Sequence, residues 1–169
     1  FSSHSPVPFE NTWSMRKEDL SDYLAEIKQA QIKFDGQMEI YSSLEIDYIP
    51  GMVGPRDLWI RQLKLDYTIG SVHFVGSFDD GSPWGIDGPH QLFLDGLERI
   101  YYQNAEHAVR DYFALTRKMV RESCPDIIGH MDKIKMQNRG FWDEEADWYK
   151  SEILATLEEI KSSGAIVEV

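Results

Sequence analysis

The spacing of apolar residues divides the chain into segments that alternate between strand and helix patterns. Apolar side chains recur at near-helical spacing in residues 15–34, 92–123 and 143–163. Short runs rich in β-branched and aromatic residues at 38–47, 66–75, 126–130 and 165–169 are typical of strands. The pattern predicts a strand followed by a helix, repeated about four times, which favours a parallel sheet with crossover helices.

Glycine, proline and capping residues predict where these elements begin and end. Ser14 is a candidate cap for the first helix, and Pro55 a candidate first residue of a short helix over 55–65. The 92–123 helix is expected to break near Gln103 and Asn104, and Gly164 to end the last helix. Residues 76–90 form a long loop rich in Gly, Pro and Asp, of a length that commonly carries function.

Composition limits the class of protein and its partners. With 169 residues, 42% of them hydrophobic, the chain can bury a substantial core, and residues 1–169 are expected to lie in a single domain. A net charge of −12 without a basic stripe argues against nucleic acid and anionic membranes as partners. Cys124 is the only cysteine, and neither a membrane span nor a signal peptide is evident, so a cytoplasmic location is expected.

Ionisable side chains occur where several predicted strands end. Glu45 lies on the first full strand, His73 near the end of the second and His130 at the end of the third, and His4 is expected at the end of a strand that would lie upstream of Phe1. The carboxyl ends of parallel strands meet at one rim of the sheet, where ligands commonly bind. A lone buried histidine is often an ordinary core residue, but ionisable groups that converge on one rim are better explained by shared cations. Imidazole and carboxylate together suit zinc, manganese or iron(II).

Other polar residues near this rim have two interpretations each. Asp47 points to the same side of its strand as Glu45, so it either supports the site or caps the following turn. His90 either touches substrate or is solvated, and Lys133, Lys135 and Arg139 either bind a phosphate or form a solvated basic patch. The loop residues Trp13, Trp84 and Trp142 either wall a substrate pocket or cover the core, and His107 has no expected role.

Four segments, in this order, resemble the polymerase and histidinol phosphatase (PHP) family, and in particular its histidinol-phosphatase branch. They are SSHSPVPFENTWSM, LEIDYIPG, DYTIGSVHFV and IIGHMDKI. The resemblance implies a distorted (β/α)7 TIM-like barrel with three divalent metal ions at the carboxyl ends of its strands. It further implies that Glu45 bridges two ions, that His73 and His130 hold one of those two, and that His4 holds the third.

Two parts of the family pattern are absent from this chain. The family's His-x-His is expected before Phe1 and its Asp-x-His after Val169, so we expect the chain to be the internal part of a longer domain, without its first and last strand segments. Ser3 stands where the family commonly has Asp, which removes a possible hydrogen-bond acceptor next to His4.

The resemblance implies a metal-dependent phosphatase that converts L-histidinol phosphate to L-histidinol and phosphate in histidine biosynthesis. Catalysis is expected to depend on Glu45, His73 and His130 through a metal-activated water, with Lys135, Arg139 and His90 as candidate substrate contacts. Two alternatives stay open: a phosphatase of the same fold acting on another small phosphomonoester, and a non-catalytic scaffold domain.

Overall fold

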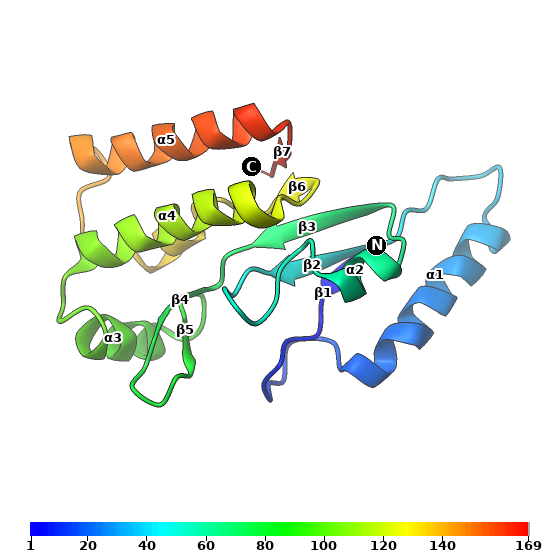
Figure 1. Ribbon diagram of the computed structural model, residues 1–169, viewed down its shortest axis with the longest axis horizontal. Helices are drawn as coiled ribbons and strands as arrows, with labels where there is room; N and C mark the ends of the chain where they lie inside the picture. The colour runs from blue at the N-terminus through cyan, green and yellow to red at the C-terminus, as the bar shows by residue number, and fades with distance from the viewer. Residues whose placement is uncertain (169) are drawn as a thin grey trace.

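The computed structural model describes residues 1–168, and its centre is a parallel sheet of five strands (Figure 1). The strand order is β1-β2-β3-β6-β7, and each neighbouring pair is parallel. These strands are β1 (Ser2–His4), β2 (Ser43–Asp47), β3 (Tyr67–Ser71), β6 (Ile127–Ile128) and β7 (Ile166–Val167). The predicted parallel sheet is confirmed, although the expected last strand, 165–169, extends to a residue outside the described ones.

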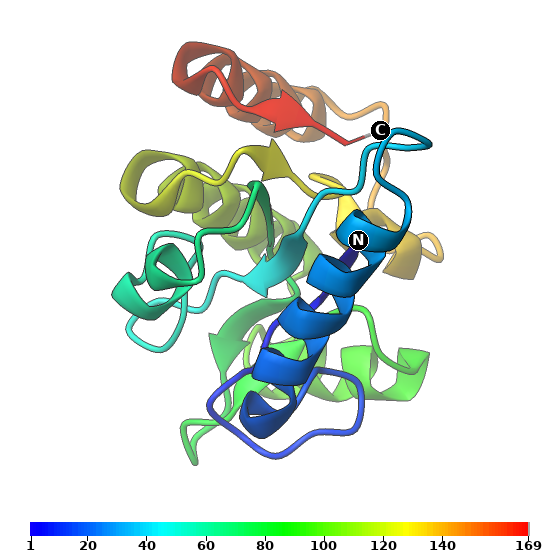
Figure 2. The same ribbon diagram turned by 90° about the vertical axis from the view of Figure 1, so that its right-hand side faces the viewer.

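Helices connect consecutive strands of this sheet, as the alternating pattern predicted. They are the 3₁₀ turn η1 (Lys17–Asp19) and α1 (Leu20–Lys33) before β2, α2 (Leu58–Gln62) before β3, α3 (His90–Arg99) and α4 (Ala105–Ser123) before β6, and η2 (Lys133–Gln137) and α5 (Asp147–Ser163) before β7. Figures 1 and 2 show α4 and α5 side by side near β6 and β7, with α1 toward the β1 and β2 end.

Alternation along β2 separates the hydrophobic core from the polar face of the sheet. Leu44 and Ile46 are fully buried and pack with Leu20 of α1 and Ile60 of α2. Successive residues of a strand point to opposite faces, so the side chains between them, including Glu45, face away from this cluster. A second cluster joins α3, α4 and α5 to the other strands. The polar face of β2 is therefore free to carry a site.

The expected strand over 66–75 is divided, which was not predicted. β3 ends at Ser71, and Phe74–Ser77 forms β4, which pairs antiparallel with β5 (Pro83–Gly85) in a separate two-stranded sheet. The hairpin turn is closed by Asp80, whose Oδ1 accepts hydrogen bonds from the Ser82 backbone and hydroxyl at 2.9 and 2.6 Å. Part of the loop predicted over 76–90 is therefore structured.

The predicted helix boundaries are confirmed at the ends of α3 and α5 and wrong at two starts. Tyr102 and Gln103 adopt positive φ angles of 50° and 63° between α3 and α4, and Gly164 ends α5 at φ 78°. Ser14 caps no helix, because the helical segment begins only at Lys17 and the residue at its N-cap position is Arg16. Pro55 precedes α2 instead of starting it, since this helix begins at Leu58.

The expected TIM-like barrel is not seen as a closed structure. Within residues 1–168 the sheet is open, because β1 pairs only with β2 and β7 only with β6. What the structure contains is a mixed α/β arrangement of parallel strands and connecting helices.

Candidate metal centre

Four ionisable side chains predicted from separate strand ends lie together at the carboxyl rim of the sheet. His4 ends β1 and is directly opposite Glu45 of β2 in the strand register. His73 follows the end of β3, and His130 lies two residues beyond β6. Parallel pairing of β1, β2, β3 and β6 brings all four to the same end of the sheet.

Three of their donor atoms have the spacing of ligands around one ion. His130 Nε2 lies 3.1 Å from Glu45 Oε1 and 3.2 Å from His73 Nε2, and His73 Nε2 lies 3.6 Å from Glu45 Oε1. Ligands at 2.0–2.2 Å in a tetrahedral shell would be separated by about 3.3–3.6 Å. Glu45, His73 and His130 can therefore hold a divalent ion with little movement of their side chains.

The second oxygen of Glu45 faces another set of donors. Glu45 Oε2 lies 3.8 Å from His4 Nδ1, whereas the two Nε2 atoms are nearest to Oε1. His4, Asp47 and His73 form a second group whose potential ligand atoms lie within 4.8 Å of one another. A carboxylate with donors at both oxygens has the arrangement needed to bridge two ions.

Asp47 fixes the orientation of the His73 ring. The Asp47 side chain is fully buried, and its Oδ1 lies 2.7 Å from His73 Nδ1. An Nδ1–H that donates to this carboxylate leaves the Nε2 lone pair directed toward Glu45 and His130, which is the tautomer a metal requires. Of the two interpretations of Asp47, the structure favours the one in which it supports the site, here by holding the His73 ring in place.

The charges of the site follow from these contacts. Burial alone would raise the pKa of Glu45, but hydrogen bonds from His130 and Ser71 and the nearby His4 and His73 lower its pKa to about 2. Glu45 is thus a carboxylate at any physiological pH. Burial lowers the pKa of His73, yet Asp47, Asp87 and Glu45 together outweigh burial and raise it. Protons therefore compete with a metal for His73 as the pH falls.

Unpaired buried atoms concentrate around these side chains. Three of the buried side-chain atoms that have no hydrogen-bond partner among the described residues are His4 Nδ1, His130 Nδ1 and Asp47 Oδ2. An unpartnered buried polar atom costs about 1–3 kcal/mol. His4 and Asp47 belong to the second potential ligand group, so their unpaired atoms are available to bind an ion, whereas His130 Nδ1 lies on the other side of its ring from the proposed ligand atom Nε2.

The backbone before His130 is closely packed against the neighbouring strand. A side chain at Gly129 would overlap the hydroxyl of Ser71, which donates to Glu45 Oε1 at 2.8 Å. His130 itself has a φ of 21°, a conformation that L residues rarely adopt and that commonly persists at functional sites. Gly129 thus permits the approach of β6 that brings His130 to Glu45.

The remaining predicted contacts lie away from the four side chains. Lys135 pairs with Glu144 at 2.9 Å, and His90 Nδ1 lies 2.8 Å from Gln137 Oε1 at the start of α3. Arg139 lies in the turn after η2 and has no side-chain hydrogen bond or ion pair among residues 1–168. His107 is exposed on α4. None of these four adjoins Glu45.

Of the three loop tryptophans considered as pocket walls, only one has a substantially exposed ring. Trp84 and Trp142 are 1% and 8% exposed and belong to the core, whereas Trp13 is 44% exposed. The Trp13 ring meets His4 edge-on, with ring centroids 5.3 Å apart. Of these three rings, Trp13 is therefore the one that contacts a proposed metal ligand.

Sequence reasoning missed two residues that touch the site, Ser71 and Asp87. Asp87 Oδ2 lies 3.7 Å from His73 Nε2 and 3.9 Å from Lys133 Nζ. The length of the 76–90 loop was a signal for function, but it did not indicate which residue would face His73.

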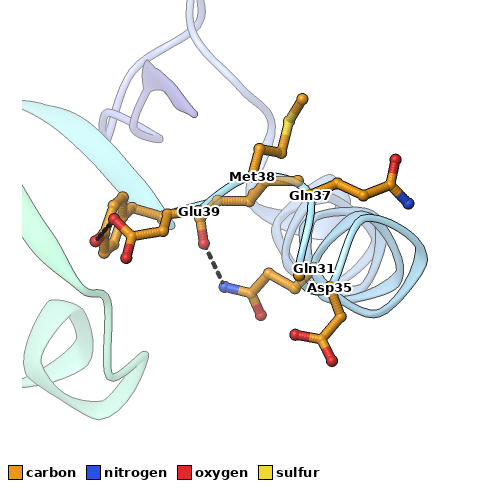
Figure 3. A pocket seen from close by; sticks show the side chains of 8 residues that line it. Gln31, Asp35, Gln37, Met38 and Glu39 are labelled. Carbon is orange, nitrogen blue, oxygen red and sulfur yellow. Dashed lines mark hydrogen bonds between the residues drawn. The ribbon is translucent and has the colours of Figure 1, made fainter.

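A different pocket is lined by Gln31, Asp35, Met38 and Glu39 (Figure 3). These residues come before the amino end of β2, so this pocket lies away from the carboxyl rim of the sheet.

Replacing Asp47 by asparagine is expected to weaken metal binding by about 10- to 100-fold, because outer hydrogen-bond partners of ligating histidines have effects of this size. Isothermal titration of the full-length protein with Mn²⁺ or Zn²⁺ measures it. Asp79→Asn, an exposed site in the β4–β5 turn, is the control and should bind metal normally. Unchanged affinity in a folded Asp47→Asn protein would show that the bond to His73 does not orient the ring.

The chain is similar to proteins of one family. The model of the PHP domain family matches residues 1–169. A protein from Deinococcus radiodurans named probable histidinol-phosphatase is 34% identical over 134 residues, which are 78% of this chain and 47% of that protein. The chain thus spans about half the length of this curated relative.

A solved structure from Listeria monocytogenes, which carries a provisional assignment as a histidinol phosphatase, has a similar fold. Its TM-score is 0.77 at 16% sequence identity, over 98% of this chain and 68% of that one.

Among the described residues, no helix is both long and apolar enough to cross a membrane.

Proposed function

The chain belongs to the PHP domain family, and on that premise we propose that it is part of a metal-dependent phosphomonoesterase of the histidinol-phosphatase type. The proposed reaction is hydrolysis of L-histidinol phosphate to L-histidinol and phosphate in histidine biosynthesis, in the cytoplasm. The observation that carries the proposal is the spacing of Glu45 Oε1, His73 Nε2 and His130 Nε2, three donors within 3.1 to 3.6 Å of one another. The relative from Deinococcus radiodurans supports the choice of substrate.

Glu45, His73 and His130 would hold one ion, and His4, on the other side of the Glu45 carboxylate, a further one. Three ions in total, of zinc, manganese or iron, are part of the proposal. When bound, such ions would polarise phosphate oxygens and lower the pKa of a coordinated water toward ~7. They would also reverse the local sign of charge, which a protein of net charge −12 needs in order to hold a phosphate dianion.

The chain's own residues prepare this site in three ways. Asp47 holds His73 in the tautomer that presents Nε2, and Ser71 holds Glu45 Oε1 through a hydrogen bond of 2.8 Å. Glu45 stays ionised because its pKa is about 2. Trp13 packs edge-on against His4, with ring centroids 5.3 Å apart, and so limits the positions that the His4 ring can take.

The fold around the site is part of the same proposal. We place residues 1–169 in one PHP domain, and we propose that the five parallel strands belong to a distorted TIM-like barrel. The open pairing positions of β1 and β7 support this, because further parallel strands can pair there.

A substrate panel tests the proposed reaction. The full-length protein supplied with Mn²⁺ or Zn²⁺ should release phosphate from L-histidinol phosphate with a kcat/KM at least about 10-fold above that for glycerol phosphate or a sugar phosphate. A preference for one of those other esters would favour a PHP phosphatase of different specificity. Absence of turnover in protein shown to contain metal would favour the non-catalytic scaffold.

A further inference from the structure

A pocket opens directly beside the proposed metal ligands. It has a volume of about 650 Å³, and His4 and His73 form part of its wall. The aromatic side chains of Trp13, Phe74 and Phe78 line it together with three carboxylates, Asp80, Asp87 and Asp95, and one guanidinium, Arg99. A phosphomonoester whose phosphate lies at His73 would extend the rest of its alcohol into this space, which has an excess of negative charge.

Of the three carboxylates, only Asp87 lacks a hydrogen-bond donor among the described residues. Asp80 accepts from Ser82 within its hairpin turn, and Asp95 Oδ2 accepts from Arg99 at 3.1 Å. The nearest cation to Asp87 is Lys133, whose Nζ is 3.9 Å from Oδ2, beyond hydrogen-bond distance. Asp87 is 34% exposed in its side chain and therefore open to a ligand in the pocket.

The backbone on both sides of Asp87 is tied to the site. The Ile86 N–H donates to the carbonyl of His73 at 2.9 Å, and the Gly88 carbonyl accepts from Gln137 Nε2 at 3.0 Å. Gln137 is itself buried, with only 3% of its surface exposed. Two tethers around one residue hold its carboxylate in a defined place next to His73, as expected for a group that recognises a ligand.

Asp87 lies beside His73 but outside both potential ligand groups. Each of the two potential ligand groups found among the described residues has all its donor atoms within 4.8 Å of one another, and neither group includes Asp87. Its Oδ2 is nevertheless only 3.7 Å from His73 Nε2, so one small molecule can contact both the centre and Asp87.

We propose that Asp87 binds an ammonium group on the alcohol portion of the substrate and so selects phosphomonoesters of amino alcohols. The inference rests on the proposed phosphatase function and adds the residue that gives it specificity. An ammonium supplies the donors that Asp87 lacks, and it balances the negative charge of the pocket. The aromatic wall suits a cationic ligand as well: Arg99 already lies over the Phe78 ring, 4.6 Å from its centroid.

The test compares two esters that differ only in the amine. L-histidinol phosphate and its deaminated analogue, 3-(imidazol-4-yl)propyl phosphate, are hydrolysed at pH 8, above the ordinary imidazole pKa of about 6.5. We expect the full-length wild-type protein to prefer the amine ester by about 10- to 100-fold in kcat/KM, the range of a hydrogen bond to a charged group. In Asp87→Asn this preference should fall to within a few fold, while kcat/KM for the deaminated ester stays near the wild-type value.

Asp95→Asn is the matched control, because it removes the same charge from the same pocket wall at a carboxylate that is already paired. It should retain the preference for the amine ester. If Asp87→Asn and Asp95→Asn lost the preference for the amine ester equally, the effect would come from the overall negative charge of the pocket. That result would overturn the proposed contact between Asp87 and the ammonium group.

Metal content gives a readout that is independent of turnover. Asp87→Asn should bind as many equivalents of Mn²⁺ as wild type, and a lost equivalent would make Asp87 a metal ligand and overturn the inference. An unchanged amine preference in Asp87→Asn would also overturn it, while leaving the phosphatase proposal intact. Turnover of neither ester by metal-loaded wild-type protein would overturn the phosphatase proposal itself.

Discussion

Glu45→Gln in the full-length protein is expected to lower kcat for phosphate release by about 10³-fold or more, which corresponds to several kcal/mol of transition-state stabilisation. Glu45 places one oxygen toward His73 and His130 and the other toward His4. A neutral amide would remove the negative charge between two proposed ions and so increase their repulsion, whereas His73→Ala or His130→Ala would remove a single donor from one ion. The informative measurement is kcat together with the metal content of each variant.

The control for these substitutions is His107→Ala. His107 is exposed on α4, where it lies 3.6 Å from Asp111 of the same helix and edge-on to Tyr101, so its loss should leave kcat and metal content at the wild-type values. A Glu45→Gln protein that kept its metals and turned over like wild type would remove the basis for the bridging role.

Removal of bound metal is expected to have an effect of similar size on the full-length protein. Dialysis of the full-length protein against a strong chelator should abolish phosphatase activity, and addition of manganese, zinc or iron(II) should restore it. The reason is that the rim presents imidazoles and carboxylates with the spacing of metal ligands, and the Ser71 hydroxyl there donates to Glu45 Oε1, a proposed ligand atom, so we expect the nucleophile to be a metal-activated water. Atomic absorption must confirm that the dialysed protein is free of metal.

A metal-free protein that still hydrolysed its substrate at the original rate would rule out this mechanism. Activity that is lost on dialysis and not restored by any of the three metals would instead indicate unfolding, which circular dichroism of the dialysed sample would detect.

The parallel sheet and its rim could be predicted because their causes are local in the sequence. The alternation of Leu44 and Ile46 with Glu45 and Asp47 reports the two faces of β2 directly. The order of strand and helix segments then requires crossover connections, and these put the ends of the parallel strands at one rim. This reasoning predicts that Glu45, His73 and His130 meet at one rim, and their side chains do lie together there.

The pairing partners of polar side chains could not be predicted, since they depend on contacts between distant segments. Lys135 looked available for phosphate, but it pairs with Glu144 in the structure. Asp87 gave no signal beyond its place in a long loop, because its position depends on Gln137, which lies 50 residues further along and is buried only after folding. The break between β3 and β4 was missed because both halves have strand composition.

The central claim is that Glu45, His73 and His130 bind one ion together, and anomalous diffraction from crystals of the full-length protein grown with Mn²⁺ or Zn²⁺ tests it most directly. The account predicts an anomalous peak bonded to Glu45 Oε1, His73 Nε2 and His130 Nε2, each at about 2.0–2.2 Å. A fully loaded protein with no peak among these three atoms, or with its ions bound elsewhere, would contradict the account.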